Sequence, residues 1–134
     1  MRRLCVRYIK RFIGLPYRWK GDDPIKGFDC SGLVVEMFKM AGIMKEHEDL
    51  TADGIKKSLK DKKVEKPKVG VLVFYGTEEA THVGICLNRK YMIEAGGGSS
   101  KVDTEKEAAD RNAYIRIRPI DRRSDILGFY DPFL

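Results

Sequence analysis

The sequence predicts an α+β fold in which helices come first and an antiparallel β-sheet follows. In residues 1–43, apolar side chains recur at helical spacing, which favours amphipathic helices. From residue 69 onward, short apolar runs and alternating apolar and polar residues favour strands joined by tight turns. No internal repeat or change of composition divides the 134 residues, so we expect a single domain over residues 1–134.

The first expected element is a helix over residues 2–13, ended by Gly14 and Pro16. Its apolar positions at helical spacing are Leu4, Tyr8, Ile9, Phe12 and Ile13. Its other side carries Arg3, Arg7, Lys10 and Arg11. Such a basic amphipathic helix can lie on a membrane, but packing against a core with the basic side in solvent is the preferred interpretation.

A second helix is predicted directly after the loop of residues 14–29, beginning at Cys30. Asp29 is the expected N-cap, because a carboxylate there accepts hydrogen bonds from the first free N–H groups of a helix. Gly42 is expected to end the helix, because glycine readily adopts the left-handed conformation found there. The residues expected to be buried are Leu33, Val34, Met37 and Phe38.

Two shorter helices are expected at residues 51–60 and 104–112. The expected caps are Asp49 or Thr51 for the first and a Thr104–Glu107 capping box for the second. The lysine-rich residues 56–68 are interpreted as a solvated connector. Strands are expected at residues 69–76, 81–87, 90–95, 113–119 and 126–134.

The second and third of these strands form a hairpin in which we expect His82 to lie directly opposite Glu94. That register gathers Val83, Ile85, Tyr91 and Ile93 on the other, apolar face, and a slip by one residue would destroy the separation. Directly opposed Cβ atoms are about 5 Å apart, within reach of a hydrogen bond between a carboxylate and an imidazole. The sequence therefore predicts a histidine oriented by a glutamate.

Cys30 is the nucleophile that such a histidine would activate. Cysteine reacts as the thiolate, which a helix N-terminus and a neighbouring imidazolium both stabilise. The N–H of Cys30 at the same helix start is a natural donor to an oxyanion. We therefore expect Cys30 as nucleophile, His82 as base and then acid, and Glu94 as the residue that orients the imidazole. Each of these residue types is more often structural by itself, and only their joint pattern favours catalysis.

Four segments follow one another in a distinctive order, namely GLPYRWKG, GFDCSGLVVEMFKMAGI, VGVLVFYG and HVGICLNRKYMIEA. Together they resemble the NlpC family of papain-like cell-wall cysteine peptidases. The resemblance implies a papain-like domain, with N-terminal helices packed on a central antiparallel sheet and the nucleophile at a helix N-terminus. It also implies cleavage of peptidoglycan stem peptides, typically next to a D-γ-glutamyl residue, without a metal or other cofactor.

The resemblance assigns the nucleophile to Cys30, the histidine to His82 and the third polar residue to Glu94. It further implies substrate contacts at Tyr17, Asp29 and Ser31. The third position is commonly histidine in the family, and a carboxylate there is expected to raise the pKa of the catalytic histidine.

The net charge indicates which kinds of partner the protein could bind, and the absence of long apolar segments indicates where it is made. The 26 basic and 20 acidic residues give a formal net charge of +6, which suits nucleic acid, anionic lipid and acidic wall polymers alike. Because no nucleic-acid-binding motif is present, the expected partner is peptidoglycan or a muropeptide and no specific nucleic acid. The sequence contains neither a long apolar run nor a signal-peptide core. We therefore expect synthesis in the cytoplasm, and we expect no insertion into a membrane.

Two routes to the substrate are consistent with this expectation. One is a phage-encoded enzyme that is virion-associated, with other virion tail proteins as partners, or that is released by lysis. The other is a cytosolic enzyme that acts on recycled muropeptides. Three alternatives to an endopeptidase stay open: a catalytically inactive wall-binding or virion structural module, an amidase or acyltransferase using Cys30, and a basic nucleic-acid binder.

Other conspicuous residues are assigned simpler roles. Cys5 and Cys86 are expected to pack in the core, and His47 is expected in solvent. The three cysteines form no CxxC pair and the two histidines are not clustered, so neither a disulfide framework nor a metal site is expected. Arg116 and Arg118 are expected on the solvated side of their strand, and residues 96–101 at the rim of the active site.

Overall fold

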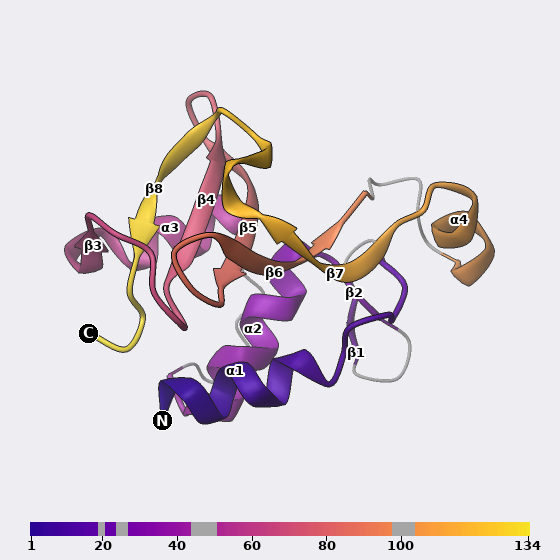
Figure 1. Cartoon of the computed structure of the whole chain (residues 1–134), viewed down its shortest axis with the longest axis horizontal. Coiled ribbons are helices and arrows are strands. Elements are labelled where there is room, and N and C mark those ends of the chain that lie inside the picture. The colour runs from indigo at the N-terminus through magenta and orange to yellow at the C-terminus, as the bar shows by residue number, and fades with distance from the viewer. Residues whose placement is uncertain (19–20, 24–26, 44–50, 98–103) are drawn as a thin grey trace.

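The computed structural model describes residues 1–18, 21–23, 27–43, 51–97 and 104–134. Its helices are α1 (Arg2–Lys10), α2 (Cys30–Ala41), α3 (Ala52–Ser58) and α4 (Glu105–Asp110), with one-turn 3-10 helices η1 (Lys60–Lys62) and η2 (Ile120–Arg122). Its strands are β1 (Asp22–Asp23), β2 (Gly27–Phe28), β3 (Lys63–Val64), β4 (Leu72–Gly76), β5 (Ala80–Cys86), β6 (Tyr91–Gly96), β7 (Tyr114–Pro119) and β8 (Ile126–Tyr130). Three helices thus precede an antiparallel sheet, which confirms the α+β prediction (Figure 1).

The main sheet has six antiparallel strands in the order β3-β8-β4-β5-β6-β7. The C-terminal strand β8 lies between β3 and β4, so that Tyr130 pairs with both Lys63 and Leu72. The lysine-rich segment that we interpreted as a solvated connector therefore also supplies the edge strand β3. The loop expected at residues 14–29 likewise contains a small second sheet, in which β1 pairs with β2.

The sheet is covered on both faces, although unequally. Side chains of α1, α2 and α3 form the larger core with one face of the sheet, for example Ile9, Phe38 and Ile55 against Phe74 and Ile85. A smaller cluster on the other face consists of Val71, Val73, Tyr75, Cys86, Met92 and Ile120. Strand β4 is thus buried on both sides, which explains its nearly continuous apolar sequence.

Helix α1 ends at Lys10, earlier than predicted. Gly14, with φ of +96°, donates its N–H to the carbonyl of Ile115, and this bond takes the chain away from the helix axis. The apolar face is also displaced from the predicted one, since Leu4 is 52% exposed and Ile13 is 43% exposed. The buried α1 residues are Cys5, Val6 and Ile9. The basic residues of α1 face solvent as predicted.

The termini predicted for the other helices are mostly correct. In α2, Asp29 is the N-cap and Gly42 the left-handed C-cap, and the four residues expected to be buried are buried. Thr51 caps α3 by accepting the Gly54 N–H, while the alternative cap, Asp49, lies outside the described residues. Thr104 caps α4 by accepting the Glu107 N–H, but the Glu107 carboxylate accepts from the Thr104 hydroxyl, so the reciprocal bond of a capping box is not formed. Within the described residues, no helix is long and apolar enough to cross a membrane.

The β5–β6 hairpin has a register two residues away from the predicted one. Ile85 pairs with Ile93 rather than with Tyr91. The predicted pairing was wrong because it would leave Asn88 alone to reverse the chain, and a hairpin turn needs at least two residues. Residues 88–90 make the turn instead, and the Asn88 side-chain oxygen accepts two backbone hydrogen bonds at 2.8 and 2.9 Å.

This shift preserves the side-chain faces of both strands. Side chains alternate with a period of two, so an even shift leaves every residue on its predicted face. Val83 and Ile85 are buried in the larger core as predicted, whereas Tyr91 is 45% exposed beside the turn. His82 and Glu94 still share the opposite face, but as diagonal neighbours rather than as directly opposed residues.

Candidate active site

Cys30 is the first residue of α2 and is half-buried. N–H groups of the first helical turn have no acceptor within the helix, and the Cys30 N–H is one of them. Cys30 lies near the imidazole of His82 on β5, close enough for its side chain to raise the pKa of His82. The structure therefore brings together the thiol, the helix N-terminus and the histidine that the sequence predicted to meet.

The start of α2 is organised by Asp29. Its Oδ1 atom accepts a hydrogen bond from the Gly32 N–H at 2.6 Å and another from the Ser31 hydroxyl at 3.3 Å. Glycine is required at position 32, since a Cβ atom there would overlap the carbonyl oxygen of Gly21. Asp29 and Ser31, two of the expected substrate contacts, thus flank Cys30 and help to define its backbone geometry.

Strands β5 and β6 position the His82–Glu94 pair. The Nε2 atom of His82 lies 2.9 Å from Oε1 of Glu94. His82 is 9% exposed and Glu94 is fully buried. Diagonal neighbours on adjacent strands are about 7–8 Å apart at the backbone, a gap that long side chains span. Because Nε2 faces Glu94, Nδ1 is the ring nitrogen left for Cys30.

The protonation of this pair follows from its neighbours. Burial by itself lowers the pKa of His82, but hydrogen bonds to Cys30 and Glu94 and the negative charges of both raise that pKa to about 9. Burial raises the pKa of Glu94, yet the bond from His82 and the charge of Arg122 hold it below its ordinary value. An ionised carboxylate only accepts hydrogen bonds, so the proton lies on Nε2.

Arg122 is a member of the site that sequence analysis missed. Its Nε and Nη2 atoms lie 3.3 and 3.1 Å from Oε1 of Glu94, the same oxygen that His82 contacts. Arg122 belongs to η2, which directly follows β7. The sequence offers only an arginine pair after the strand of residues 113–119, and no periodic pattern links that pair to Glu94.

Gly96 and Arg116 enclose the rest of the Glu94 carboxylate. A Cβ atom on Gly96 would overlap Oε2 of Glu94, so the missing side chain provides the space for this oxygen. Arg116 pairs with Glu94 across β6 and β7, and its Nη1 donates to the Asn112 carbonyl at 3.0 Å. Among the described residues, Oε2 of Glu94 and Nε of Arg116 are buried without a hydrogen-bond partner. Arg116, expected on the solvated side of its strand, is therefore half-buried, with its Nε atom shielded from solvent.

Tyr17 lies next to Cys30. Its N–H donates to the Ala113 carbonyl at 3.0 Å and its backbone forms a bridge with Phe28, so two distant segments hold it. Burial and the negative charges of Cys30 and Asp29 raise the pKa of Tyr17 well above its usual range. Tyr17 is thus a neutral phenol. Five of the six predicted site residues lie at or near the start of α2, and the sixth, Glu94, is joined to them through His82.

The remaining cysteines and His47, to which the sequence assigned simpler roles, either lie away from the candidate active site or fall outside the described residues. Cys86 is fully buried in the smaller core, where burial raises its pKa to about 12. Cys5, on α1, is fully buried in the larger core. Their predicted packing roles are confirmed. His47 and residues 98–103 lie outside the described residues. Within the part of the chain that the structure describes, no cluster of three or more His, Cys, Asp or Glu side chains could hold a metal ion.

Sequence comparison finds relatives that match about two thirds of this chain. An alignment 89 positions long, which covers 63% of this chain, is 38% identical to the bifunctional muramidase/DL-endopeptidase CwlT of Bacillus subtilis and covers 26% of it. An alignment 98 positions long, which covers 69% of this chain, is 32% identical to the murein DD-endopeptidase MepH of Escherichia coli and covers 35% of it. The matched region thus spans about a third or less of either relative.

Structure comparison finds the same fold. An NlpC/P60 family protein from Bacillus cereus superposes with a TM-score of 0.77 at 20% identity, over 100% of this chain and 41% of that one. RipD from Mycobacterium tuberculosis, described as a non-catalytic NlpC/p60 domain protein, gives a TM-score of 0.71 at 20% identity over 99% and 97%. The model of the NlpC/P60 family matches residues 14–118, which include Tyr17, Cys30, His82 and Glu94. The chain therefore belongs to the NlpC/P60 family.

Proposed function

We propose that this chain is a cysteine endopeptidase that hydrolyses peptidoglycan stem peptides next to a D-γ-glutamyl residue. The observation that carries the proposal is that Cys30, at the N-terminus of α2, lies near His82, whose Nε2 atom is 2.9 Å from Glu94. The relatives CwlT and MepH, named as DL- and DD-endopeptidases, support the substrate class. The choice of bond rests on the resemblance to the family.

In the first step, Cys30 attacks as the thiolate while His82 is the imidazolium. With a pKa of about 9, His82 holds at neutral pH the proton that the leaving group will need. As the sulfur bonds to the carbonyl carbon, the oxygen becomes negative and the Cys30 N–H stabilises it. The C–N bond then breaks, His82 gives its Nδ1 proton to the leaving amine, and a thioester is left on Cys30.

In the second step, water hydrolyses the thioester. The now neutral Nδ1 of His82 takes a proton from the water, whose oxygen attacks the thioester carbonyl. The C–S bond breaks, the carboxylic acid product leaves, and the thiolate and imidazolium are restored. Throughout, Glu94 accepts the Nε2–H bond, so it keeps Nδ1 toward Cys30 and stabilises the imidazolium charge.

Substrate contacts are assigned to the residues beside the sulfur. Tyr17 and Ser31 offer neutral hydroxyl groups, which donate hydrogen bonds to peptide carbonyls. Asp29 offers a carboxylate next to Cys30, although one of its oxygens also caps α2. We expect Tyr17 and Ser31 to affect KM for a stem peptide more than the fold, whereas Asp29 should affect both because it caps α2.

Mass spectrometry of muropeptides incubated with the protein tests the proposal. Cleavage should add one water to each broken bond and leave a free D-γ-glutamyl carboxyl group. Cys30→Ala should abolish cleavage, whereas Cys5→Ala removes a buried thiol from α1 and should retain it. Full activity of Cys30→Ala would overturn the assignment.

A non-catalytic wall-binding module is the second candidate. It is favoured by Glu94, which stands where the family commonly has histidine and shares one oxygen between His82 and Arg122. Alkylation with iodoacetamide separates the two candidates. A catalytic Cys30 should react fast and lose that rate in His82→Ala, with buried Cys5 and Cys86 as unreactive internal references.

Amidase or acyltransferase chemistry would use the same thioester. The difference lies in the bond that is broken and in the acceptor that attacks the acyl-enzyme. Product masses distinguish them, because hydrolysis adds water whereas transfer adds the mass of an amine acceptor. An endopeptidase should give the hydrolysed product even when a free diamino acid is supplied.

A further inference from the structure

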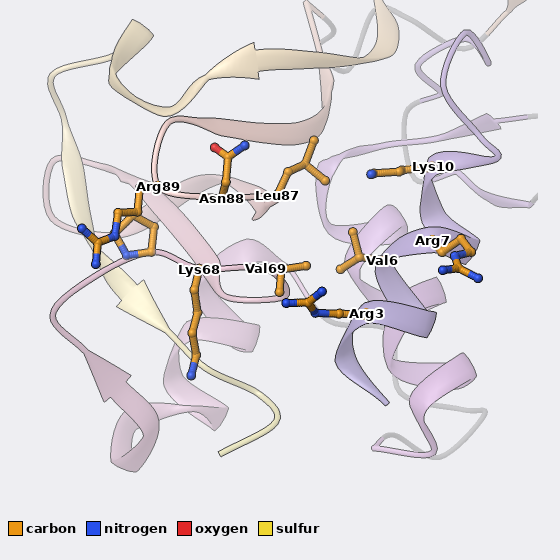
Figure 2. Close-up of a pocket in the computed structure, with 10 residues that line it drawn as sticks. Arg3, Val6, Arg7, Lys10, Lys68, Val69, Leu87, Asn88 and Arg89 are labelled. Carbon is orange, nitrogen blue, oxygen red and sulfur yellow. The ribbon is translucent and has the colours of Figure 1, made fainter.

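A pocket lies at the opposite end of β5 from His82. Figure 2 shows the residues that line it. Three segments line it, namely α1, residues 67–69 and the hairpin turn at residues 87–89. Its volume of about 530 Å³ is in the range of ligand-binding pockets. Leu87 in its wall is about 17 Å along an extended strand from His82, so the pocket is separate from the candidate active site.

The pocket is strongly basic. Its charged lining residues are Arg3, Arg7, Lys10, Lys68 and Arg89, and no carboxylate of the described residues lines it. In the described parts of the chain, none of these five side chains takes part in an ion pair. Gathering like charges without counter-charges costs free energy, and a bound anion would remove that cost. The lining therefore points to an anionic ligand.

The arrangement of the charges calls for an extended ligand. Arg3, Arg7 and Lys10 follow one another at helical spacing along one side of α1, over about 10 Å. Figure 2 shows Arg3 and Lys10 extending from α1 toward Val69 and Leu87. Lys68 and Arg89 belong to the two other segments, so cations flank the pocket on both sides. A single phosphate could not meet them all, whereas a chain of phosphates could.

The uncharged lining narrows the class of polyanion. Among the described residues it consists of the aliphatic side chains of Val6, Val69 and Leu87, together with Pro67 and the amide of Asn88, and it contains no aromatic side chain. Single-stranded nucleic acids are usually held by aromatic side chains on which bases stack, and such a platform is missing from this lining. A flat membrane surface cannot follow a concave lining. A flexible chain of small aliphatic units joined by phosphates matches both features.

The pocket walls are held together by contacts outside the lining. Arg2 donates to the Val69 carbonyl at 3.2 Å, and this bond connects α1 to the segment at residues 67–69. The same side chain pairs with Asp131 at 2.9 Å, which connects α1 to the C-terminal residues. The Gly70 N–H donates to the Cys86 carbonyl at 2.9 Å, which ties that segment to the end of β5. The pocket is thus formed in the protein before any ligand binds.

We propose that this pocket binds a linear phosphodiester polymer of a small polyol, of the glycerol phosphate type. Such a chain would hold the protein on an anionic surface polymer while the Cys30 site meets its peptide. The inference goes beyond the proposed function and does not depend on it, since the pocket contains no residue of the Cys30–His82–Glu94 site.

Fluorescence anisotropy with a labelled poly(glycerol phosphate) oligomer tests the proposal, using the full chain with Cys30→Ala. Binding should weaken steeply as salt rises, because counterions are released from the polymer. Adding Arg3→Gln, Arg7→Gln and Lys10→Gln together should weaken binding about tenfold. The same triple change should reduce the slope of log affinity against log salt by about two.

A matched triple variant controls for net charge. Lys60→Gln, Lys106→Gln and Arg111→Gln remove the same number of exposed charges outside the pocket and should leave binding unchanged. Equal weakening in both triple variants would refute the pocket. So would tighter binding of a single-stranded oligonucleotide with equal phosphate count, or of phosphatidylglycerol vesicles, because either would assign the charges to another partner.

Hydrolysis of a soluble, phosphate-free stem peptide separates this proposal from the previous one. With Cys30 intact, the pocket triple variant should cleave that peptide at the parental rate, and a loss there would contradict two separate sites. Polymer binding by a chain that cleaves no stem peptide would refute the proposed peptidase and support the pocket.

Discussion

The Nε2 atom of His82 lies 2.9 Å from an oxygen of Glu94 that is completely buried. A buried carboxylate is stable only if opposite charge and hydrogen bonds replace the water that it has lost. The imidazolium and Arg122 both supply this compensation at Oε1, while Oε2 has no hydrogen-bond partner among the described residues. The pKa values of His82 and Glu94 therefore depend on each other, and activity should follow both.

Glu94→Gln should shift the pH dependence of activity. The substitution removes a negative charge that raises the pKa of His82, so that pKa should fall from about 9 by a unit or more. The imidazolium would then deprotonate at lower pH, and the alkaline limb of the kcat/KM profile should move the same way. At neutral pH, kcat/KM should fall about tenfold or more.

The matched control is Glu78→Gln, which neutralises an exposed carboxylate near the β4–β5 turn. Its profile for stem-peptide hydrolysis should overlay that of the parent. An unchanged alkaline limb in Glu94→Gln would show that Glu94 does not control the protonation of His82.

Arg122→Met should act on activity through Glu94. Losing the guanidinium should raise the pKa of Glu94, so the acid limb of the profile should move to higher pH. Because Arg122 contacts Glu94 and acts as a positioning residue, kcat should fall about threefold to tenfold with little change in KM. Arg122→Lys should restore part of the loss by returning the charge.

Arg123→Met is the control for this experiment, since the neighbouring Arg123 pairs with Asp125 instead. It should leave the acid limb in place. If Arg122→Met raised KM alone, Arg122 would belong to substrate binding rather than to the positioning of Glu94.

Gly96→Ala should disturb the carboxylate without touching Cys30. The added methyl group would overlap Oε2 of Glu94, so the carboxylate must move and its 2.9 Å contact with His82 should lengthen. We expect kcat/KM to fall about tenfold or more, as for Glu94→Gln. The two changes combined should be no worse than the stronger one alone, because both act on the same contact. Additive losses in kcat/KM would contradict this.

Unfolding stability should depend on pH through His82. Its pKa is about 9 in the folded chain and 6.5 as the reference value, so its contribution is complete below 6.5 and is lost as pH rises through about 9. This contribution should be at most about 3 kcal/mol. For Glu94, whose pKa is lowered by folding, the contribution is present above its unfolded value and lost as pH falls through the folded value.

Urea unfolding of the parent and of His82→Gln at about pH 6 and about pH 10 measures this term. The parent should lose more stability than the variant between the two pH values. Parallel losses in both proteins would show that other groups cause the pH dependence.

Much of the fold and site could be predicted because the relevant signals are local. The caps Asp29 and Gly42 and the apolar spacing of α2 act within a few residues, so they place Cys30 at a helix N-terminus. Alternation along β5 and β6 also fixes which residues share a face, whatever the register. For that reason the prediction that His82 and Glu94 share a face is correct, although the predicted register is wrong by two residues.

What only the tertiary structure decided are contacts between segments that are distant in the chain. The turn at residues 88–90 set the actual register, and the pairing of β6 with β7 carried Arg122 to Glu94. The sequence predicts only that Arg3, Arg7 and Lys10 lie on the solvated side of a helix. They form a wall of the pocket because residues 67–69 and 87–89 pack opposite them. Sequence periodicity specifies which face a residue occupies, but packing through space determines what that face meets.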